Sequence, residues 1–231
     1  MEMLTPQRGD FKEAFNLNEF VAGKAQQPLP APLVPHEAHI GTFVDRCHVL
    51  CTDVLRLLAL GLGIDEDWFA ARHERARGPS GSVFRMLYYP NMPASAHDAD
   101  DIRAGAHSDY GSVTLLFQRP GQPGLEILTD GSWSPVPVNP GNDTVLPILV
   151  NAGDLLSHWT NGLLKSAVHR VVFPSGSAGD RYSLAYFCHP LDDAELVPVP
   201  SKLVAGHDRP VLTAQQHLEA RLAATMALKG A

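Results

Sequence analysis

Residues 105–118 read GAHSDYGSVTLLFQ, and this stretch joins a His-x-Asp triplet to a run rich in Val, Leu and Phe. The run predicts a β-strand at 112–118. Because a strand repeats every two residues, the side chains of His107 and Asp109 are expected on the same side, where they can share one metal ion. The triplet alone is a weak signal, since a chain with eleven histidines contains about one by chance.

Short runs rich in Val, Leu, Tyr and Phe occupy most of the chain beyond Ser82, separated by Gly, Pro, Asn and Asp. They indicate an antiparallel barrel or jelly roll, so the predicted fold class is mainly β with flanking helices. The expected strands are 83–89, 112–118, 124–128, 133–137, 147–151, 167–173 and 181–187.

One long amphipathic helix is expected before these strands, at about 42–62. Apolar residues recur there at helical spacing, and Gly61 and Gly63 lie near the end. Cys47 and Cys51 are one turn apart on it, and two thiols alone make a poor metal site, so we interpret them as packed core residues. The expected apolar stripe is Phe43, Cys47, Leu50, Val54, Leu57 and Leu58.

The two ends of the chain give further expectations. Several prolines in 23–36 resist regular structure and predict an extended surface connection. Thr213 and Gln216 form a capping-box pattern that predicts a closing helix, with a stripe of Leu218, Leu222 and Met226. The 231 residues are interpreted as one domain: an extended segment and bracing helix at about 1–80, a jelly-roll core at about 81–190, and a C-terminal strand and helix at about 191–231.

Net charge, cysteine spacing and the distribution of apolar residues indicate which partners and which compartment to expect. The net charge is −7, and Lys and Arg are scattered, so neither nucleic acid nor a membrane surface is expected to bind. Three cysteines without CxxC spacing argue against disulfides and thiolate zinc sites. The N-terminal residues MEMLTPQRGDFKEAFNL lack the pattern of a leader, and no long apolar run suggests a membrane span. A reducing cytoplasm fits these features.

A third candidate ligand lies in KSAVHRVVF, residues 165–173, where His169 interrupts a β-branched run. Taken alone, His169 is more simply a core or edge histidine bonded to the backbone. Together with His107 and Asp109 it completes a set of two imidazoles and one carboxylate, which is typical of non-haem iron oxygenases. The same residue types can hold a hydrolytic zinc ion, so they do not settle the metal by themselves.

A candidate anion site follows in DRYSLAYFCHP, residues 180–190. The period of a strand places Arg181, Ser183 and Phe187 on one face. Arg181 offers a forked, permanent charge for a carboxylate, and Ser183 adds a hydroxyl beside it. The alternative is an exposed ion pair of Arg181 with Asp180, with Ser183 only filling space.

Four motifs in order resemble the isopenicillin N synthase-like branch of the iron(II)/2-oxoglutarate oxygenases. They read RMLYYP (85–90), HSD (107–109), VNAGDLLSHWTNGLLKSAVHRV (150–171) and RYS (181–183), and the resemblance runs from about Asp10 to the C-terminal helix. It implies a double-stranded β-helix, the jelly roll with iron at one mouth. It also implies Fe(II), 2-oxoglutarate and O₂ as cofactor and cosubstrates, and hydroxylation, desaturation or cyclisation of a small organic molecule with release of succinate and CO₂.

The resemblance assigns roles to individual residues. His107, Asp109 and His169 are the implied iron ligands, and Arg181 and Ser183 the implied partners of the distal carboxylate of 2-oxoglutarate. The resemblance further implies Tyr89 as a hydroxyl contact to the cosubstrate. Phe187 is a candidate for the substrate pocket because it shares the strand face of Arg181 and Ser183, and Arg85 is a further candidate. The alternative for both aromatic residues is a place in the core. Where the family carries Asn, two residues before Tyr89, this chain has Leu87.

The chief departure from the family lies at the N-terminus. Family members usually carry a further region there, which covers the barrel and shapes the pocket, and this chain begins after it. We therefore expect bare apolar surface, which favours a homodimer. Two alternatives stay open: a 2-oxoglutarate-independent oxidase, and a catalytically silent binding module. A metal-independent hydrolase is remote, because no Gly-x-Ser-x-Gly elbow is present.

Overall fold

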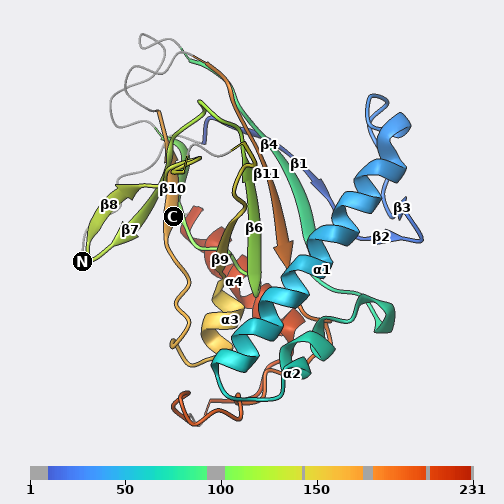
Figure 1. Ribbon diagram of the computed structural model, residues 1–231, viewed down its shortest axis with the longest axis vertical. Coiled ribbons are helices and arrows are strands. Elements are labelled where there is room, and N and C mark those ends of the chain that lie inside the picture. The colour runs from blue at the N-terminus through green and yellow to red at the C-terminus, as the bar shows by residue number, and fades with distance from the viewer. Residues whose placement is uncertain (1–9, 93–101, 142–143, 174–178, 207–208, 230–231) are drawn as a thin grey trace.

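Two antiparallel sheets form the body of the protein (Figure 1). The computed structural model describes residues 10–92, 102–141, 144–173, 179–206 and 209–229. The five-stranded sheet has the order β1 (Glu13–Leu17), β4 (Val83–Tyr89), β11 (Arg181–Cys188), β6 (Val113–Gln118) and β9 (Leu149–Ala152). The four-stranded sheet has the order β5 (Ile102–His107), β10 (His169–Val172), β7 (Leu125–Thr129) and β8 (Ser132–Pro135). This is the predicted jelly roll.

The seven predicted strands are all present, and their ends differ from the prediction by a few residues. Two strands of the main sheets were not predicted, β1 and β5. Their sequences, EAFNL and IRAGAH, have few β-branched residues, and it is pairing with β4 and β10 that makes them strands. Both lie at sheet edges, where burial of one face is incomplete.

Helix α1 (Glu37–Gly61) lies across the outer face of the five-stranded sheet (Figure 1). It begins five residues before the predicted start, and Gly63 follows its end with a φ of +68°, which favours glycine. The predicted apolar stripe is only partly right, because Leu57 is 67% exposed. The buried stripe is Gly41, Val44, Cys47, Cys51, Leu55 and Ala59, so both cysteines are core residues as predicted.

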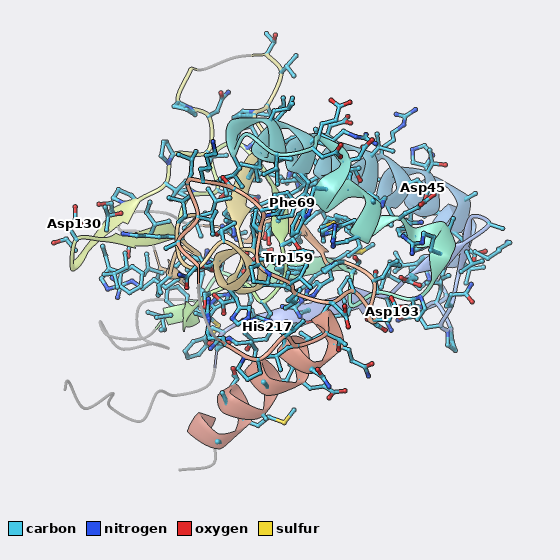
Figure 2. All side chains as sticks on the ribbon, turned by 90° about the horizontal axis from the view of Figure 1, so that it is seen from below. Asp45, Phe69, Asp130, Trp159, Asp193 and His217 are labelled. Carbon is cyan, nitrogen blue, oxygen red and sulfur yellow. The ribbon has the colours of Figure 1, made fainter. Side chains whose placement is uncertain are left out.

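An aromatic cluster joins α1 to the helices below the sheets. Helix α2 (Asp67–Ala70) contributes Trp68 and Phe69, and helix α3 (Asp154–Trp159) contributes Trp159. The ring centres of Phe69 and Trp159 are 5.4 Å apart, and Figure 2 shows both inside the body of the molecule. Short 3-10 turns flank these helices at Val34–His36, Ala71–His73 and Arg75–Arg77. The cluster anchors α3, which follows directly on β9.

The C-terminal helix α4 (Ala214–Lys229) confirms the capping box, because the Gln216 amide donates to Thr213 Oγ1 and the Thr213 amide donates to Gln216 Oε1. The predicted apolar stripe is wrong: Leu222 and Met226 are 40% and 70% exposed. The helix projects from the body, and its buried residues are Ala214 and His217. No strand forms where one was predicted within the described part of 191–213, which has only two isolated bridges, Leu191 with Ser80 and Glu195 with Thr213.

The segment 23–36 is less extended than predicted. Strand β3 (Lys24–Ala25) pairs with β2 (Phe20–Val21), and a 3-10 turn at Val34–His36 leads into α1. Residues 1–9, about half of the N-terminal stretch that lacks the pattern of a leader, lie outside the described residues. Among the described helices, none combines the length and apolar character needed to cross a membrane.

His189 is buried beneath the turn that follows β5, and burial lowers its pKa to about 4. An unfolded chain takes up this proton near pH 6.5, whereas the folded protein resists it until about pH 4. Stability from this residue is therefore complete above pH 6.5 and is lost as the pH falls toward 4. We expect urea unfolding at pH 5 to show about 2 kcal/mol less stability from this group than at pH 7.5. His189→Gln should remove that part of the pH dependence, and an unchanged slope would contradict the assignment.

Candidate active site

The three predicted metal ligands converge between the two sheets. Strand β10 pairs with β5 so that His169 lies directly opposite His107, and their ring centres are 4.4 Å apart. Asp109 Oδ1 lies 3.7 Å from His169 Nε2. One nitrogen or oxygen from each residue lies within 4.8 Å of those of the other two, which is the spacing of ligands around a single cation.

The side chains of His107 and Asp109 meet for a different reason from the one predicted. His107 is the last residue of β5, and Asp109 lies in the turn after it, so the two-residue period of a strand does not apply. The turn is fixed by its backbone: the Asp154 amide donates to the Asp109 carbonyl at 2.7 Å. Gly111 and Gly153 cross here so closely that a Cβ on Gly153 would collide with the Gly111 carbonyl. Glycine is needed at this crossing.

Backbone carbonyls orient both imidazoles. Nδ1 of His107 lies 2.7 Å from the Gly105 carbonyl, and Nδ1 of His169 lies 3.0 Å from the Ala167 carbonyl. A carbonyl can only accept, so each Nδ1 carries the proton and each Nε2 keeps its lone pair for a metal. The residue His107 is exposed at the cavity mouth, but desolvation of its ring, followed by the nearby His169, lowers its pKa, which favours the neutral form that a metal requires.

A buried cation lies in the same cavity. Arg181 is 2% exposed, and no carboxylate of the described residues lies within ion-pair distance of it. Its guanidinium donates to Ser183 Oγ at 3.2 Å and to Gln118 Oε1 at 3.0 Å, both neutral groups. Burial lowers the pKa of Arg181, which reflects this uncompensated charge. An anion in the cavity would supply the missing counter-charge.

The other predicted pocket residues also line this cavity. Tyr89 is directly opposite Arg181 across the β4–β11 pair, and its ring centre is 4.9 Å from the guanidinium carbon. Burial raises the pKa of Tyr89, so its hydroxyl keeps its proton as a donor. The Arg85 guanidinium lies 5.0 Å from the Phe187 ring centre, and its Nε donates to Asn16 Oδ1 at 2.7 Å. Leu87 lies between these groups and adds an apolar wall.

Two site residues were missed in the sequence. Gln118, the last residue of β6, accepts from Arg181, and Asn151 on β9 donates from Nδ2 to Asp109 Oδ2 at 2.8 Å. The period of β6 and β9 could have placed both on the inner face, next to Thr114 and Leu149. Their partners could not be found that way, because they depend on the order of strands in the sheet.

The residues on either side of Asp109 are tied to the two C-terminal helices. Ser108 Oγ donates to Asp154 Oδ2 at 2.9 Å, and Arg221 of α4 pairs with the same oxygen at 2.7 Å. The Tyr110 hydroxyl and Thr225 Oγ1 of α4 are 2.6 Å apart. The turn of residues 108–112, called the ligand turn below, is therefore held by α3 and α4 as well as by the sheet.

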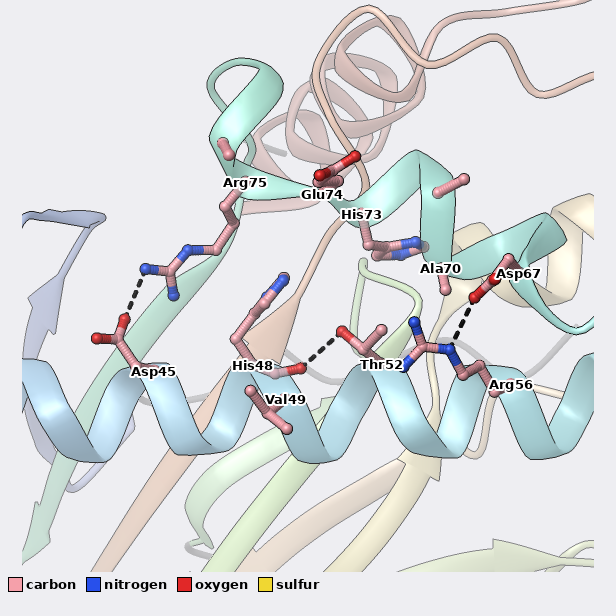
Figure 3. Close-up of a pocket in the computed structure, with 12 residues that line it drawn as sticks. Asp45, His48, Val49, Thr52, Arg56, Asp67, Ala70, His73, Glu74 and Arg75 are labelled. Atoms are coloured by element: carbon pink, nitrogen blue, oxygen red, sulfur yellow. Dashed lines mark hydrogen bonds and ion pairs between the residues drawn. The ribbon is translucent and has the colours of Figure 1, made fainter.

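A second, larger cavity of about 550 Å³ lies between α1 and the turns after α2 (Figure 3). Figure 3 shows an ion pair at each end, Arg75 with Asp45 and Arg56 with Asp67, each 2.8 Å long. Both arginines are thus neutralised by the protein itself, unlike Arg181. We therefore place the candidate active site in the smaller cavity between the sheets.

Comparisons with known proteins agree with this geometry. The family model of the 2OG-Fe(II) oxygenase superfamily matches residues 80–190. The crystal structure of a full-length Neurospora crassa protein in complex with alpha-KG superposes with a TM-score of 0.82, 31% identity, and coverage of 97% of this chain and 70% of that one. The Schizosaccharomyces pombe UPF0676 protein C1494.01 is 35% identical over 96% of this chain and 67% of its own length. The 2-oxoglutarate-dependent dioxygenase frbA of Dothideomycetidae sp. is 34% identical over 71% of this chain and 49% of its own.

This chain belongs to the 2OG-Fe(II) oxygenase superfamily. It spans about half of the length of most of the curated relatives that it matches. Iron(II) and 2-oxoglutarate are the metal and cosubstrate of this family, and the residues fit both. Two imidazoles and a carboxylate on one side of an iron ion leave further positions open, and the uncompensated Arg181 lies where a dicarboxylate can reach it.

Proposed function

We propose that this protein is an iron(II)- and 2-oxoglutarate-dependent dioxygenase that oxidises a small organic substrate. The observation that carries the proposal is the convergence of His107, Asp109 and His169 in a cavity that also holds the buried Arg181, which forms no ion pair with a described carboxylate. The three converging side chains are unfavourable without a cation, and the buried Arg181 is unfavourable without an anion. Iron and a dicarboxylate satisfy both.

Some side chains of the cavity bind the cosubstrate, and others exclude water. When bound, iron(II) and 2-oxoglutarate would activate O₂, which oxidises the cosubstrate to succinate and CO₂ and oxidises the substrate. Arg181 binds the distal carboxylate through its fork, and Ser183, whose oxygen already accepts from Arg181, can turn its O–H toward the same anion. Tyr89 contributes a second hydroxyl. The apolar walls around them, such as Leu87, Leu116 and Phe187, exclude water.

The first test uses anaerobic protein with Fe(II) and 2-oxoglutarate. Chelation of the metal by the keto acid should give a metal-to-ligand charge-transfer band, and admitting air should then give succinate. Without the band and without substrate oxidation, the chain is better explained as a silent binding module. Iron binding with substrate oxidation but no succinate would identify the 2-oxoglutarate-independent oxidase, with or without the band. The His-Asp-His geometry and the buried Arg181 are compatible with both enzymes, because Arg181 could also bind a carboxylate of the substrate, so succinate production separates them.

The substrate is proposed to enter past Arg85 and Phe187. A cation stacked over an aromatic ring offers a flat face together with N–H donors, so it suits a small planar or carbonyl-bearing molecule. Related proteins differ in their substrates: one structure of the Neurospora crassa protein contains thymine, and other relatives are named a proline hydroxylase and a validamycin A dioxygenase. Succinate release in a metabolite screen, including pyrimidines and amino acids, is the direct way to find the substrate.

Arg85→Gln should raise the KM for substrate about tenfold or more, because one charge-assisted hydrogen bond contributes about 1.5–3 kcal/mol. The half-saturating concentration of 2-oxoglutarate should stay unchanged, since Arg181 and Ser183 bind that molecule. Steady-state succinate formation with each compound varied in turn measures both. A matched control is Arg119→Gln, an exposed cation at the end of the same sheet. Equal effects of both variants would reject the role of Arg85.

We also propose that the protein forms a homodimer and works in a reducing compartment. Val145, Ile148 and Val150 are 80%, 39% and 44% exposed, on and before the edge strand β9, and such a surface favours a homodimer. Sedimentation velocity would measure whether the protein is a monomer or a dimer. Three free cysteines support a reducing compartment such as the cytoplasm. The net charge of −7 supports small molecules rather than nucleic acid as partners.

A further inference from the structure

Asn151 makes the closest side-chain contact to the carboxylate of Asp109 among the described residues. It lies on β9, opposite Thr114 of β6, and its side chain lines the cavity between the sheets. Its Nδ2 donates to Asp109 Oδ2 at 2.8 Å. An ionised carboxylate can only accept, so the amide must turn its NH₂ group toward it. The side chain of Asn151 therefore has one defined orientation here.

The two oxygens of Asp109 have different partners. Oδ1 faces the imidazoles, 3.7 Å from His169 Nε2, whereas Oδ2 receives the hydrogen bond from Asn151. Asp109 is 6% exposed, so Oδ2 has little access to water and depends on this donor. The backbone of Asp109 is fixed separately by the Asp154 amide, which leaves rotation of the carboxylate as the freedom that Asn151 removes.

We propose that Asn151 is a positioning residue that makes Asp109 bind iron through Oδ1 alone. This inference rests on the proposed metal site. A carboxylate can bind a metal through one oxygen or through both, and the second mode occupies one more coordination position. The keto acid needs two positions and O₂ a third, so a carboxylate bound through both oxygens would compete with them. Asn151 keeps Oδ2 away from the metal and so preserves the open positions.

The effect is measured by binding of Mn(II) to the full-length metal-free protein, without cosubstrate or turnover. Asn151→Leu keeps the volume and removes the donor, and we expect affinity for Mn(II) to fall about ten- to a hundredfold, the usual range for groups that support a metal ligand. Leu149→Ala is the matched control, because it changes the same strand and cavity wall without touching Asp109. It should lower the melting temperature but leave Mn(II) affinity as in the wild type.

The outcomes separate this inference from the metal site itself. If His169→Ala also binds Mn(II) like the wild type, the proposed site is wrong. If only Asn151→Leu does so, the role of Asn151 is rejected. Should Asn151→Leu fail to fold, Asn151→Ala and a crystal structure of the wild type with Mn(II) decide: binding through both oxygens of Asp109 would overturn the proposal.

Discussion

Asp109→Ala and His169→Ala are each expected to abolish succinate formation at saturating Fe(II) and 2-oxoglutarate. Each change removes one of three ligands whose atoms lie within 4.8 Å of one another, and no other His, Cys, Asp or Glu of the described residues belongs to such a group. No described residue is therefore placed to replace the lost ligand. The loss should come from the metal, because both side chains meet at the cavity rather than in the main apolar core.

Two controls make this result specific. Asp193→Ala removes an exposed carboxylate and should leave turnover unchanged. In His169→Ala, added imidazole should restore part of the Mn(II) binding, because the small ring can occupy the space of the lost side chain. Full succinate formation by either ligand variant would reject the assignment of these residues.

Arg181→Met is expected to raise the half-saturating concentration of 2-oxoglutarate about ten- to a hundredfold. This range follows from the loss of one charge-assisted pair, about 1.5–3 kcal/mol. Among the described residues the partners of the buried guanidinium, such as Ser183 and Gln118, are neutral, so its charge is unfavourable until an anion arrives. The same variant should therefore melt at or above the temperature of the wild type when no cosubstrate is present.

The second readout distinguishes binding from general damage. In the wild type, 2-oxoglutarate should raise the melting temperature, and in Arg181→Met this shift should be lost. Arg170→Met is the matched control, since Arg170 is half-buried but paired with Glu126 at 2.8 Å. It should lose some stability and keep the shift. An unaltered cosubstrate requirement in Arg181→Met would contradict the proposed role.

The sequence alone was sufficient for features with a local cause. Strands such as β4 and β11 are runs rich in Val, Leu, Tyr and Phe, and the two-residue period of a strand correctly placed Arg181, Ser183 and Phe187 on one inner face. The capping box of α4 likewise depends only on residues three apart. These patterns record short-range geometry, which a sequence can show directly.

The errors have a non-local cause. Strand β5 is a strand because β10 pairs with it, and Leu222 is exposed because the end of α4 leaves the body. Asp109 reaches the metal site through a turn held by Asp154, some forty-five positions away, and not through the strand period. Asn151 and Gln118 were missed because their partners lie on neighbouring strands that the sequence does not order.

The ties between the ligand turn and α4 bear on how the protein matures. Ser108 and Tyr110 flank Asp109, yet their partners Arg221 and Thr225 follow them by 113 and 115 positions. During synthesis the turn therefore leaves the ribosome long before α4 does. The contacts between the turn and α4 can form only after α4 has been translated, so a nascent chain that lacks α4 would hold Asp109 less firmly.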